Sequence, residues 1–217
     1  LLKTATLRKK RRGQNLKINL GCGLTVARGW VNIDGSLSCI LSKLPTGLIK
    51  FFFRFSGAQN SFSIEEYTSI LLEHEFIHYD LSLGIPFEDN SASYMFSSHF
   101  VEHLEVDDAK TLFFETFRVL EPGGVVRISV PDLEYAVSLY PEESIKMLHN
   151  YFFLVGHNNK FSQHKYMYDF GIMRAVLMEI GFTCIKRCNY REGDVPDLIE
   201  LDNRPTDSLF IEARKPT

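Results

Sequence analysis

Short apolar runs alternate along the chain with longer segments in which apolar residues recur every three or four positions. Most of the short runs end at a glycine or a polar residue and are rich in β-branched or aromatic residues, which is typical of strands. The runs lie at 16–21, 30–34, 75–81, 91–99, 125–132, 182–190 and 207–215. This pattern predicts buried strands separated by helices or long connections.

Two segments carry the apolar stripe of an amphipathic helix. The first lies at 109–120 and follows Asp107 and Asp108, whose charges favour the positive end of a helix dipole. The Glu-Pro-Gly-Gly at 121–124 is expected to end this helix, because proline and glycine do not extend it. The second stripe lies at 170–180 and stops at a glycine.

The alternation of strands and helices predicts an α/β fold with a Rossmann-like, mostly parallel sheet and helices on both faces. The last two predicted strands are separated by a polar loop at 191–206 instead of a helix, which indicates an antiparallel ending. A chain of 217 residues is large enough for one domain with a substantial core.

Charge is unevenly distributed along the chain. Residues 1–17 carry seven of the 24 basic side chains and no acidic one, which leaves 17 basic against 27 acidic side chains in the remainder. An acidic body argues against a broad nucleic-acid-binding face, since phosphate neutralisation drives such binding. We expect residues 1–14 to form a basic, solvated tail that precedes a single domain at 15–217.

Cysteine spacing and hydropathy restrict the setting of the protein. Cys22, Cys39, Cys184 and Cys188 fit no zinc-binding spacing, and a chain of this size does not need disulfides for stability. No apolar run reaches the roughly 20 residues that span a bilayer. We therefore expect a cytoplasmic protein with reduced thiols, no transmembrane segment and no metal site.

Small or polar residues stand at the ends of five predicted strands. In an open α/β sheet, ligands bind beyond the carboxyl ends of the strands. Glycine lets a ligand approach the backbone closely, a carboxylate can accept hydrogen bonds from a ribose diol or an exocyclic amine, and a leucine can pack on a purine. The strand ends are Gly21–Gly23, Asp34, Asp80–Leu81, Ser97–His99 and Pro131–Asp132. Together they predict a ligand that contains a nucleoside.

A nicotinamide dinucleotide is the competing ligand, and with it an oxidoreductase. Its fingerprint needs a third glycine and an acidic residue about 20 positions further on. Here Val26 occupies the third glycine position and Asp34 comes earlier. Residues 24–29 are also too few for a crossover helix that could bind a pyrophosphate. The spacing favours a ligand without phosphates.

Several segments resemble, in their order and spacing, the motifs of class I S-adenosylmethionine-dependent methyltransferases, and of the type-11-like group in particular. They are INLGCG at 18–23, the strand-ending Asp34, HYDLSLGIPFEDNSASYMFSSHFVEHL at 78–104 and FRVLEPGGVVRISVPD at 117–132. The resemblance covers residues 16–215. It implies a seven-stranded sheet with an antiparallel last strand and S-adenosylmethionine as the cofactor.

The resemblance also assigns roles to the strand ends. The backbone at Gly21 and Gly23 would lie against the methionine part of the cofactor, Asp34 would hold the ribose hydroxyls and Asp80 the adenine amine. Residues 97–99 would lie beneath the sulfonium. The expected cofactor-binding residues are Leu20, Gly21, Cys22, Gly23, Asp34, Asp80, Leu81, Ser97 and Ser98.

The chemistry predicts further residues. Methyl transfer from a sulfonium is an in-line displacement, to which alignment and desolvation contribute much. A hydroxyl acceptor additionally needs a base, because its own pKa lies far above 7. We expect His99, His164 and Asp132 as catalytic residues, while His103 is interpreted as a packing residue and Glu102 as a helix cap.

Two long connections, 37–75 and 136–163, are expected to be inserts or lids that shape specificity. The first contains LIKFFFRF at 48–55, for which we expect core or lid packing, with an interfacial membrane helix as the alternative. The second leads into QHKYMYD at 163–169, which resembles a segment that lines the acceptor pocket in related enzymes.

The sequence thus predicts a methyltransferase that acts on a hydroxyl group of a small molecule or a glycan precursor. N-methylation stays open, although SSHF at 97–100 replaces the Asn/Asp-Pro-Pro-Tyr/Phe element typical of enzymes that methylate amino groups of nucleic acids. The non-enzyme alternative is an inactive cofactor-binding regulator that docks a partner through its basic tail.

Overall fold

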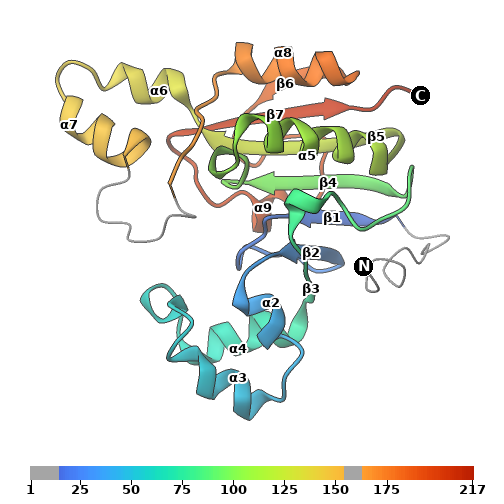
Figure 1. Ribbon diagram of the computed structural model, residues 1–217, viewed down its shortest axis with the longest axis vertical. Helices are drawn as coiled ribbons and strands as arrows, with labels where there is room; N and C mark the ends of the chain where they lie inside the picture. Colours follow the sequence, from blue (N-terminus) through green and yellow to red (C-terminus); the bar gives the residue numbers. More distant parts are fainter. Residues whose placement is uncertain (1–14, 154–162) are drawn as a thin grey trace.

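Seven strands form one sheet in the computed structural model of Figure 1, which describes residues 15–153 and 163–217. The order across the sheet is β3-β2-β1-β4-β5-β7-β6. β7 is antiparallel to both neighbours, and the other pairings are parallel. The strands are β1 (Lys17–Leu20), β2 (Trp30–Asp34), β3 (Glu75–His78), β4 (Ala92–Ser98), β5 (Leu120–Pro131), β6 (Thr183–Cys188) and β7 (Ser208–Arg214). The predicted fold class is confirmed.

Different elements pack on the two faces of the sheet. The helices α5 (Val106–Val119) and α8 (Phe170–Ile180) run along the sheet in Figure 1 and bury their apolar stripes in the main core. On the opposite face, Val195 and the short helix α9 (Leu198–Leu201) pack with Trp30 and Phe96. Alternating side chains of the strands thus enter different cores, as the pleat requires.

The boundary between α5 and β5 differs from the prediction. The helix ends at Val119, and Leu120 already has extended backbone (φ −61°, ψ 137°) and pairs with Ala92 of β4. The segment 121–124 therefore lies inside β5 and does not form a separate stop. A register shift in β4 between Ala92 and Tyr94 accommodates these residues, since a bulge relaxes the pairing locally.

Residues 21–29 join β1 to β2 without a helix, although parallel strands usually need a crossover of a dozen or more residues. Backbone turns replace the helix. The amides of Gly21 and Cys22 donate to the Ile33 carbonyl at 2.9 and 3.3 Å. The buried Asn19 side chain donates to the Thr25 carbonyl at 2.8 Å. The crossover is therefore short, as the spacing predicts, and hydrogen bonds hold it against β2.

The insert 37–75 forms a helical layer beside the β3 edge of the sheet, at the bottom of Figure 1. Its core contains Cys22 of the β1–β2 turn in addition to the insert's own buried residues. Ile49 and Phe53 are buried there as expected, whereas Phe51 and Phe55 are 57% and 71% exposed. The elements are α2 (Leu37–Leu41), α3 (Thr46–Phe53), η1 (Ala58–Asn60) and α4 (Ile64–Glu73).

The second long connection begins with α6 (Leu133–Ser138), α7 (Ser144–Met147) and η4 (Leu148–Phe152). Figure 1 shows α6 and α7 beyond the carboxyl ends of β4 and β5. Residues 154–162 and the basic tail 1–14 lie outside the described residues. Across 15–153 and 163–217, no helix is long and apolar enough to cross a membrane.

A buried ion network fastens the loop after β6 to the sheet. Arg127 of β5 has no exposed surface and donates to both carboxylate oxygens of Asp202, at 3.0 and 2.5 Å. Glu212 of β7 lies 3.5 Å from the same guanidinium and accepts hydrogen bonds from the amides of Asp194 and Val195. The network satisfies backbone groups that would otherwise be buried unpaired.

Candidate active site

A cavity of about 630 Å³ opens at the carboxyl ends of β2 and β3, and we call it the β2–β3 cavity. Its lining includes Asp34, Asp80, Leu81, Phe100 and Leu104. The volume lies within the roughly 300–1,000 Å³ typical of small-molecule sites. Two carboxylates beside apolar side chains fit the nucleoside that the sequence predicts at this edge.

Gly21 and Gly23 turn the chain at the end of β1. Both have left-handed backbone, with φ of 63° and 52°, which glycine adopts without strain. A Cβ atom on Gly21 would fall within the ring of Phe100, whereas a Cβ on Gly23 would meet no described atom within 4 Å. Gly21 thus gives room to an aromatic side chain, and Gly23 presents open backbone.

The Asp34 carboxylate holds this turn in place. One oxygen accepts from the Gly23 amide at 2.9 Å, and the other from the Ser36 amide at 2.7 Å. Each carboxylate oxygen can accept a second hydrogen bond. The half-buried side chain can therefore shape the glycine turn and still bind a hydroxyl group in the β2–β3 cavity.

Asp80 begins the 3₁₀ helix η2 (Leu81–Leu83). One of its carboxylate oxygens accepts from the amide and the hydroxyl of Ser82, at 3.0 and 2.7 Å. The Asp80 side chain is exposed, and Leu81 beside it is 6% exposed. The structure brings both into the same cavity as Asp34, where an adenine base could meet a polar and an apolar contact.

The other expected cofactor residues lie along the central strands. Leu20 is buried and pairs with Ser97 across β1 and β4. The Ser97 hydroxyl is buried with no hydrogen-bond partner among the described residues, and Ser98 is half-buried. The Cys22 side chain instead points into the core of the insert, where the Cys39 thiol and burial raise its pKa. Only the backbone of Cys22 can reach a ligand.

Three histidines converge on Glu102, directly after β4. His99 Nδ1 lies 3.3 Å from Glu102 Oε1 without the angle of a hydrogen bond, and His103 Nε2 lies 3.9 Å from the same oxygen. The rings of His103 and His164 are 5.3 Å apart. His99 itself has left-handed backbone (φ 49°), which is uncommon for residues other than glycine. We call these four side chains the histidine–carboxylate cluster.

The cluster includes residues for which the sequence predicted a different role. Glu102 lies within the 3₁₀ helix η3 (Val101–His103), is 1% exposed and does not cap the helix. The interpretation of Glu102 as a cap is therefore wrong. The spacing His-x-x-Glu-His at 99–103 was a visible signal, because one short helical turn brings these three side chains together.

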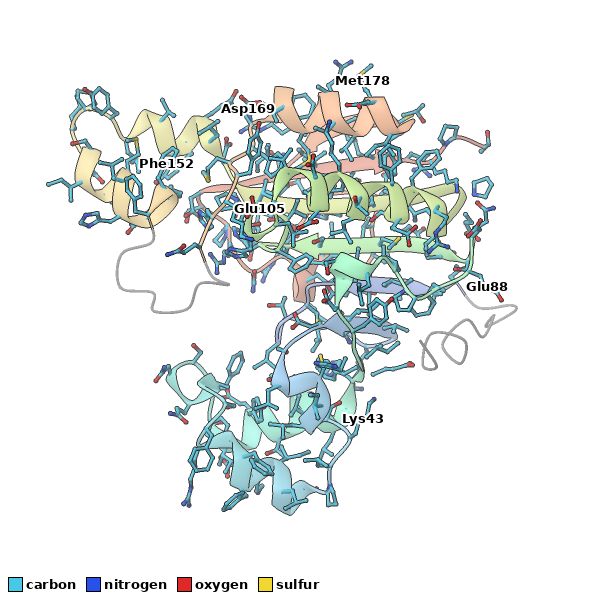
Figure 2. The ribbon with its side chains drawn as sticks, in the orientation of Figure 1. Lys43, Glu88, Glu105, Phe152, Asp169 and Met178 are labelled. Carbon is cyan, nitrogen blue, oxygen red and sulfur yellow. The ribbon has the colours of Figure 1, made fainter. Side chains whose placement is uncertain are left out.

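A second cavity, of about 670 Å³, lies beside His164 and is called the His164 cavity. Most of its lining is apolar. The lining includes Leu133, Tyr151, Phe152 and Ile172, together with His164 and Lys165. Figure 2 labels Glu105, Phe152 and Asp169 around this end of the sheet, from the segments before α5, within η4 and before α8. Residues between 133 and 153 and between 164 and 172 thus line a space next to the cluster.

Hydrogen bonding fixes the His164 ring. Its Nδ1 lies 2.8 Å from the Tyr151 carbonyl, which can only accept, so Nδ1 carries the proton and Nε2 has a free lone pair. Burial lowers the pKa of His164 and keeps the ring neutral near pH 7.

Asp132 is engaged elsewhere. Its carboxylate caps α6 by accepting from the Glu134 amide at 2.9 Å and forms an ion pair with Arg187. Both of its carboxylate oxygens are therefore engaged in structural contacts. We propose that Asp132 positions α6 at the wall of the His164 cavity.

The comparisons with known proteins agree with this architecture. The methyltransferase domain family model matches residues 57–128, a range that includes Asp80, His99 and His103 but not the glycine turn. A comparison with curated proteins finds no match.

Solved structures share the fold at low sequence identity. A methyltransferase from Thermotoga maritima, described as a possible histamine N-methyltransferase, has a TM-score of 0.55 at 12% identity, over 93% of this chain and 82% of that one. A methyltransferase from Archaeoglobus fulgidus has a TM-score of 0.52 at 15% identity, over 98% and 92%. Phosphoethanolamine N-methyltransferase 2 of Haemonchus contortus, in complex with S-adenosylhomocysteine, has a TM-score of 0.53 at 16% identity, over 99% and 53%.

The fold and the matched segment agree with the resemblance predicted from the sequence: the methyltransferase domain model covers part of the chain, and solved methyltransferases share the arrangement of the sheet. Both findings support the predicted enzyme class and cofactor. A dinucleotide-binding sheet has the strand order 3-2-1-4-5-6, whereas here the antiparallel β7 lies between β5 and β6. The nicotinamide alternative loses its support.

Proposed function

We propose that the protein transfers the methyl group of S-adenosylmethionine to a hydroxyl oxygen of a small molecule. The observation that carries the proposal is the position of the histidine–carboxylate cluster between two cavities. Phe100 and Leu104, on either side of Glu102 in the chain, line the β2–β3 cavity, and His164 lines the other. A donor on one side and an acceptor on the other would meet at the cluster.

The residues of the β2–β3 cavity fit the donor. We propose that Asp34 binds the ribose hydroxyls, that Asp80 accepts from the adenine amine and that Leu81 packs on the base. The backbone at Gly21 and Gly23 would lie against the methionine part, with Ser97 and Ser98 of β4 nearby. S-adenosylmethionine supplies an activated methyl group, and the residues named here bind and orient it.

The His164 cavity favours an acceptor with an apolar portion. Leu133, Phe152 and Ile172 offer little to a bare sugar, whose hydroxyl groups would lose hydrogen bonds to water on entering. Of the acceptors expected from the sequence, a small molecule with an aromatic or aliphatic part fits best. A glycan precursor would fit if it carries such a part.

The transfer makes specific demands on the cluster. The acceptor oxygen forms a bond to the methyl carbon while the carbon–sulfur bond breaks, and its electrons stay on the sulfur, which becomes a neutral thioether. The hydroxyl proton must leave, so the oxygen needs a group that removes or acidifies that proton. His164 is the cluster member that lies on the acceptor cavity.

N-methylation is the second candidate. Two fold relatives are named as N-methyltransferases, one of them only as a possible one, and the buried Glu102 charge could attract a protonated amine. Such an amine would have to lose its proton before the transfer, again at the cluster.

A panel assay separates these functions. The full chain would be incubated with S-adenosylmethionine and matched phenols, aliphatic alcohols and amines, and S-adenosylhomocysteine formation would be measured. We expect turnover with apolar hydroxyl acceptors, strongly reduced in His164→Asn and unchanged in the control His149→Asn, whose side chain is exposed on η4. Turnover with amines alone would replace the O-methylation proposal with the N-methylation one.

Calorimetry tests the cofactor separately. S-adenosylmethionine should bind the full chain and NAD should not. Binding of the cofactor without turnover of any acceptor would favour a regulatory protein over an enzyme.

A further inference from the structure

The Glu102 carboxyl group is buried without a hydrogen-bond partner among the described residues. Its side chain is 1% exposed, and neither carboxylate oxygen accepts a hydrogen bond from any described residue. Burying a carboxylate without partners is strongly unfavourable, so buried charges in proteins are paired, neutralised or bound to metal ions. The arrangement indicates that a cation belongs beside Glu102.

The histidines around Glu102 are prepared to bind a metal. His103 Nδ1 lies 3.1 Å from the Gln163 carbonyl, as His164 Nδ1 lies 2.8 Å from the Tyr151 carbonyl. A carbonyl only accepts, so in both rings Nδ1 holds the proton and Nε2 is left as a lone-pair donor. A metal-binding histidine typically has its second nitrogen held in this way.

We propose that Glu102, His103 and His164 bind one divalent metal ion, with Zn²⁺ as the ion that fits best. One atom from each side chain lies within 4.8 Å of the corresponding atoms of the other two. Ligands of a single tetrahedral zinc ion, at about 2.1 Å from the metal, lie about 3.4 Å apart, so small side-chain rotations close the site.

The choice of zinc follows from the ligand types. Two imidazoles and one carboxylate, with a fourth position open, form a recurring zinc set in hydrolytic enzymes, whereas Mg²⁺ and Ca²⁺ prefer oxygen ligands alone. His99 Nδ1 lies 3.3 Å from Glu102 without a hydrogen bond, and its Nε2 is bound to the Ser208 hydroxyl at 2.9 Å. His99 is therefore not included among the ligands.

The site would deepen the proposed function, and this step rests on that proposal. A metal ion at the cluster would face the His164 cavity, where its open position could bind the acceptor hydroxyl. Coordination lowers the pKa of a bound hydroxyl, so the oxygen could lose its proton near neutral pH. His164 would then act through the metal, and O-methylation would need the ion.

Zinc binding itself can be measured without turnover. The full chain, first freed of metal by a chelator, would be titrated with Zn²⁺ alone by calorimetry, and its metal content determined by mass spectrometry after dialysis. We expect one tightly bound ion per chain. Glu102→Gln and His164→Asn should each weaken binding by more than the roughly 10–100-fold that loss of an outer-shell partner costs.

Two matched variants test whether the zinc affinity depends on Glu102 and His164 specifically. Glu105→Gln alters an exposed carboxylate three residues away, and His149→Asn an exposed imidazole. Both should keep wild-type zinc affinity. Zinc binding that survives in Glu102→Gln and His164→Asn, or that is absent from the wild type, would overturn the proposal.

Thermal unfolding distinguishes loss of a ligand from loss of the fold. Without metal, Glu102→Gln should melt at a higher temperature than the wild type, because it removes an ionisable group that is buried without hydrogen-bond partners. With Zn²⁺ at 100 times its Kd, the wild type should gain about 5–10 °C and the variant should gain nothing. A variant that melts lower than the metal-free wild type would contradict the assigned role of Glu102.

The proposed function can fail independently of the metal site. S-adenosylmethionine affinity, measured on the same metal-free and zinc-loaded samples, reports on the β2–β3 cavity alone. Zinc binding without cofactor binding would leave the metal site standing and end the methyl-transfer proposal. Cofactor binding and turnover without zinc binding would leave the methyl-transfer proposal standing and end the metal-site proposal.

Discussion

Gly21 and Gly23 share a left-handed backbone but have different surroundings. Gly21 is closed in by Phe100, whereas Gly23 faces open space. At the scale of single residues, two glycines of one motif therefore have different physical reasons to be glycine.

Alanine substitution of each glycine distinguishes the packing requirement at Gly21 from the backbone requirement at Gly23. Gly21→Ala should destabilise the fold by about 2–4 kcal/mol, since left-handed strain adds to a clash with Phe100. Gly23→Ala should cost only about 1 kcal/mol, from the backbone alone. Urea unfolding of both variants would measure the difference, and equal costs would contradict the close packing of Phe100 on Gly21.

Asp34 supports a second prediction. Asp34→Ala should weaken S-adenosylmethionine binding by about 1–3 kcal/mol, because the ribose loses a charged partner and the Gly23 amide loses its acceptor. Asp34→Asn retains one carbonyl oxygen that can accept from an amide and should lose less binding free energy. Calorimetry with the cofactor compares the affinities of the two variants. Unchanged affinity in Asp34→Ala would place the ribose elsewhere.

The residues that the sequence could and could not assign differ in kind. Gly21, Asp34 and Asp80 follow apolar runs, so strand periodicity alone brings them to one edge. The role of Glu102 depends on which groups fail to reach its carboxylate, and a sequence does not display missing partners. The His-x-x-Glu-His spacing at 99–103 indicates three members of the cluster, but the fourth, His164, comes from a distant segment.

At the scale of elements, the β1–β2 turn shows how side chains substitute for a helix. Asn19 is 1% exposed and donates to both the Thr25 carbonyl and the Asn32 side chain, at 2.8 and 3.0 Å. These bonds fix the returning chain close to β2, which allows the parallel pairing with so few connecting residues.

Asn19→Ala should therefore destabilise the protein by about 1–3 kcal/mol, since a buried carbonyl and a buried amide lose their partner. Asn203→Ala is the matched control, because Asn203 donates to the Thr25 hydroxyl from an exposed position. Urea unfolding should show a clear loss for Asn19→Ala and little change for Asn203→Ala. Equal effects would contradict the role of the buried bonds.

Sequence periodicity predicted elements with a clear alternation or stripe, such as β2 at 30–34 and α8 at 170–180, to the residue. It did not resolve the insert into separate helices. There the phenylalanines of 48–55 divide between a buried and an exposed side, so apolar character alone did not indicate which side packs.

At the scale of the whole molecule, the Arg127 network holds the loop after β6 on the sheet. Arg127→Met should cost about 3–5 kcal/mol, because buried Asp202 would lose its cation and Glu212 would keep only the partly exposed Lys186. The exposed pair of Arg28 and Glu73 provides the control, and Arg28→Met should change stability little. Urea unfolding compares the two, and a tolerated Arg127→Met would show that water reaches these carboxylates.

The burial of Cys22 has a consequence for communication within the protein. Its thiol lies in the core of the insert, while the amide of the next residue, Gly23, donates to Asp34, which lines the β2–β3 cavity. Loosening of the insert must then disturb the binding turn, and by thermodynamic reciprocity an occupied cavity must make the insert harder to open. Slower amide exchange in 37–75 on adding S-adenosylmethionine would register that coupling at a distance from the ligand.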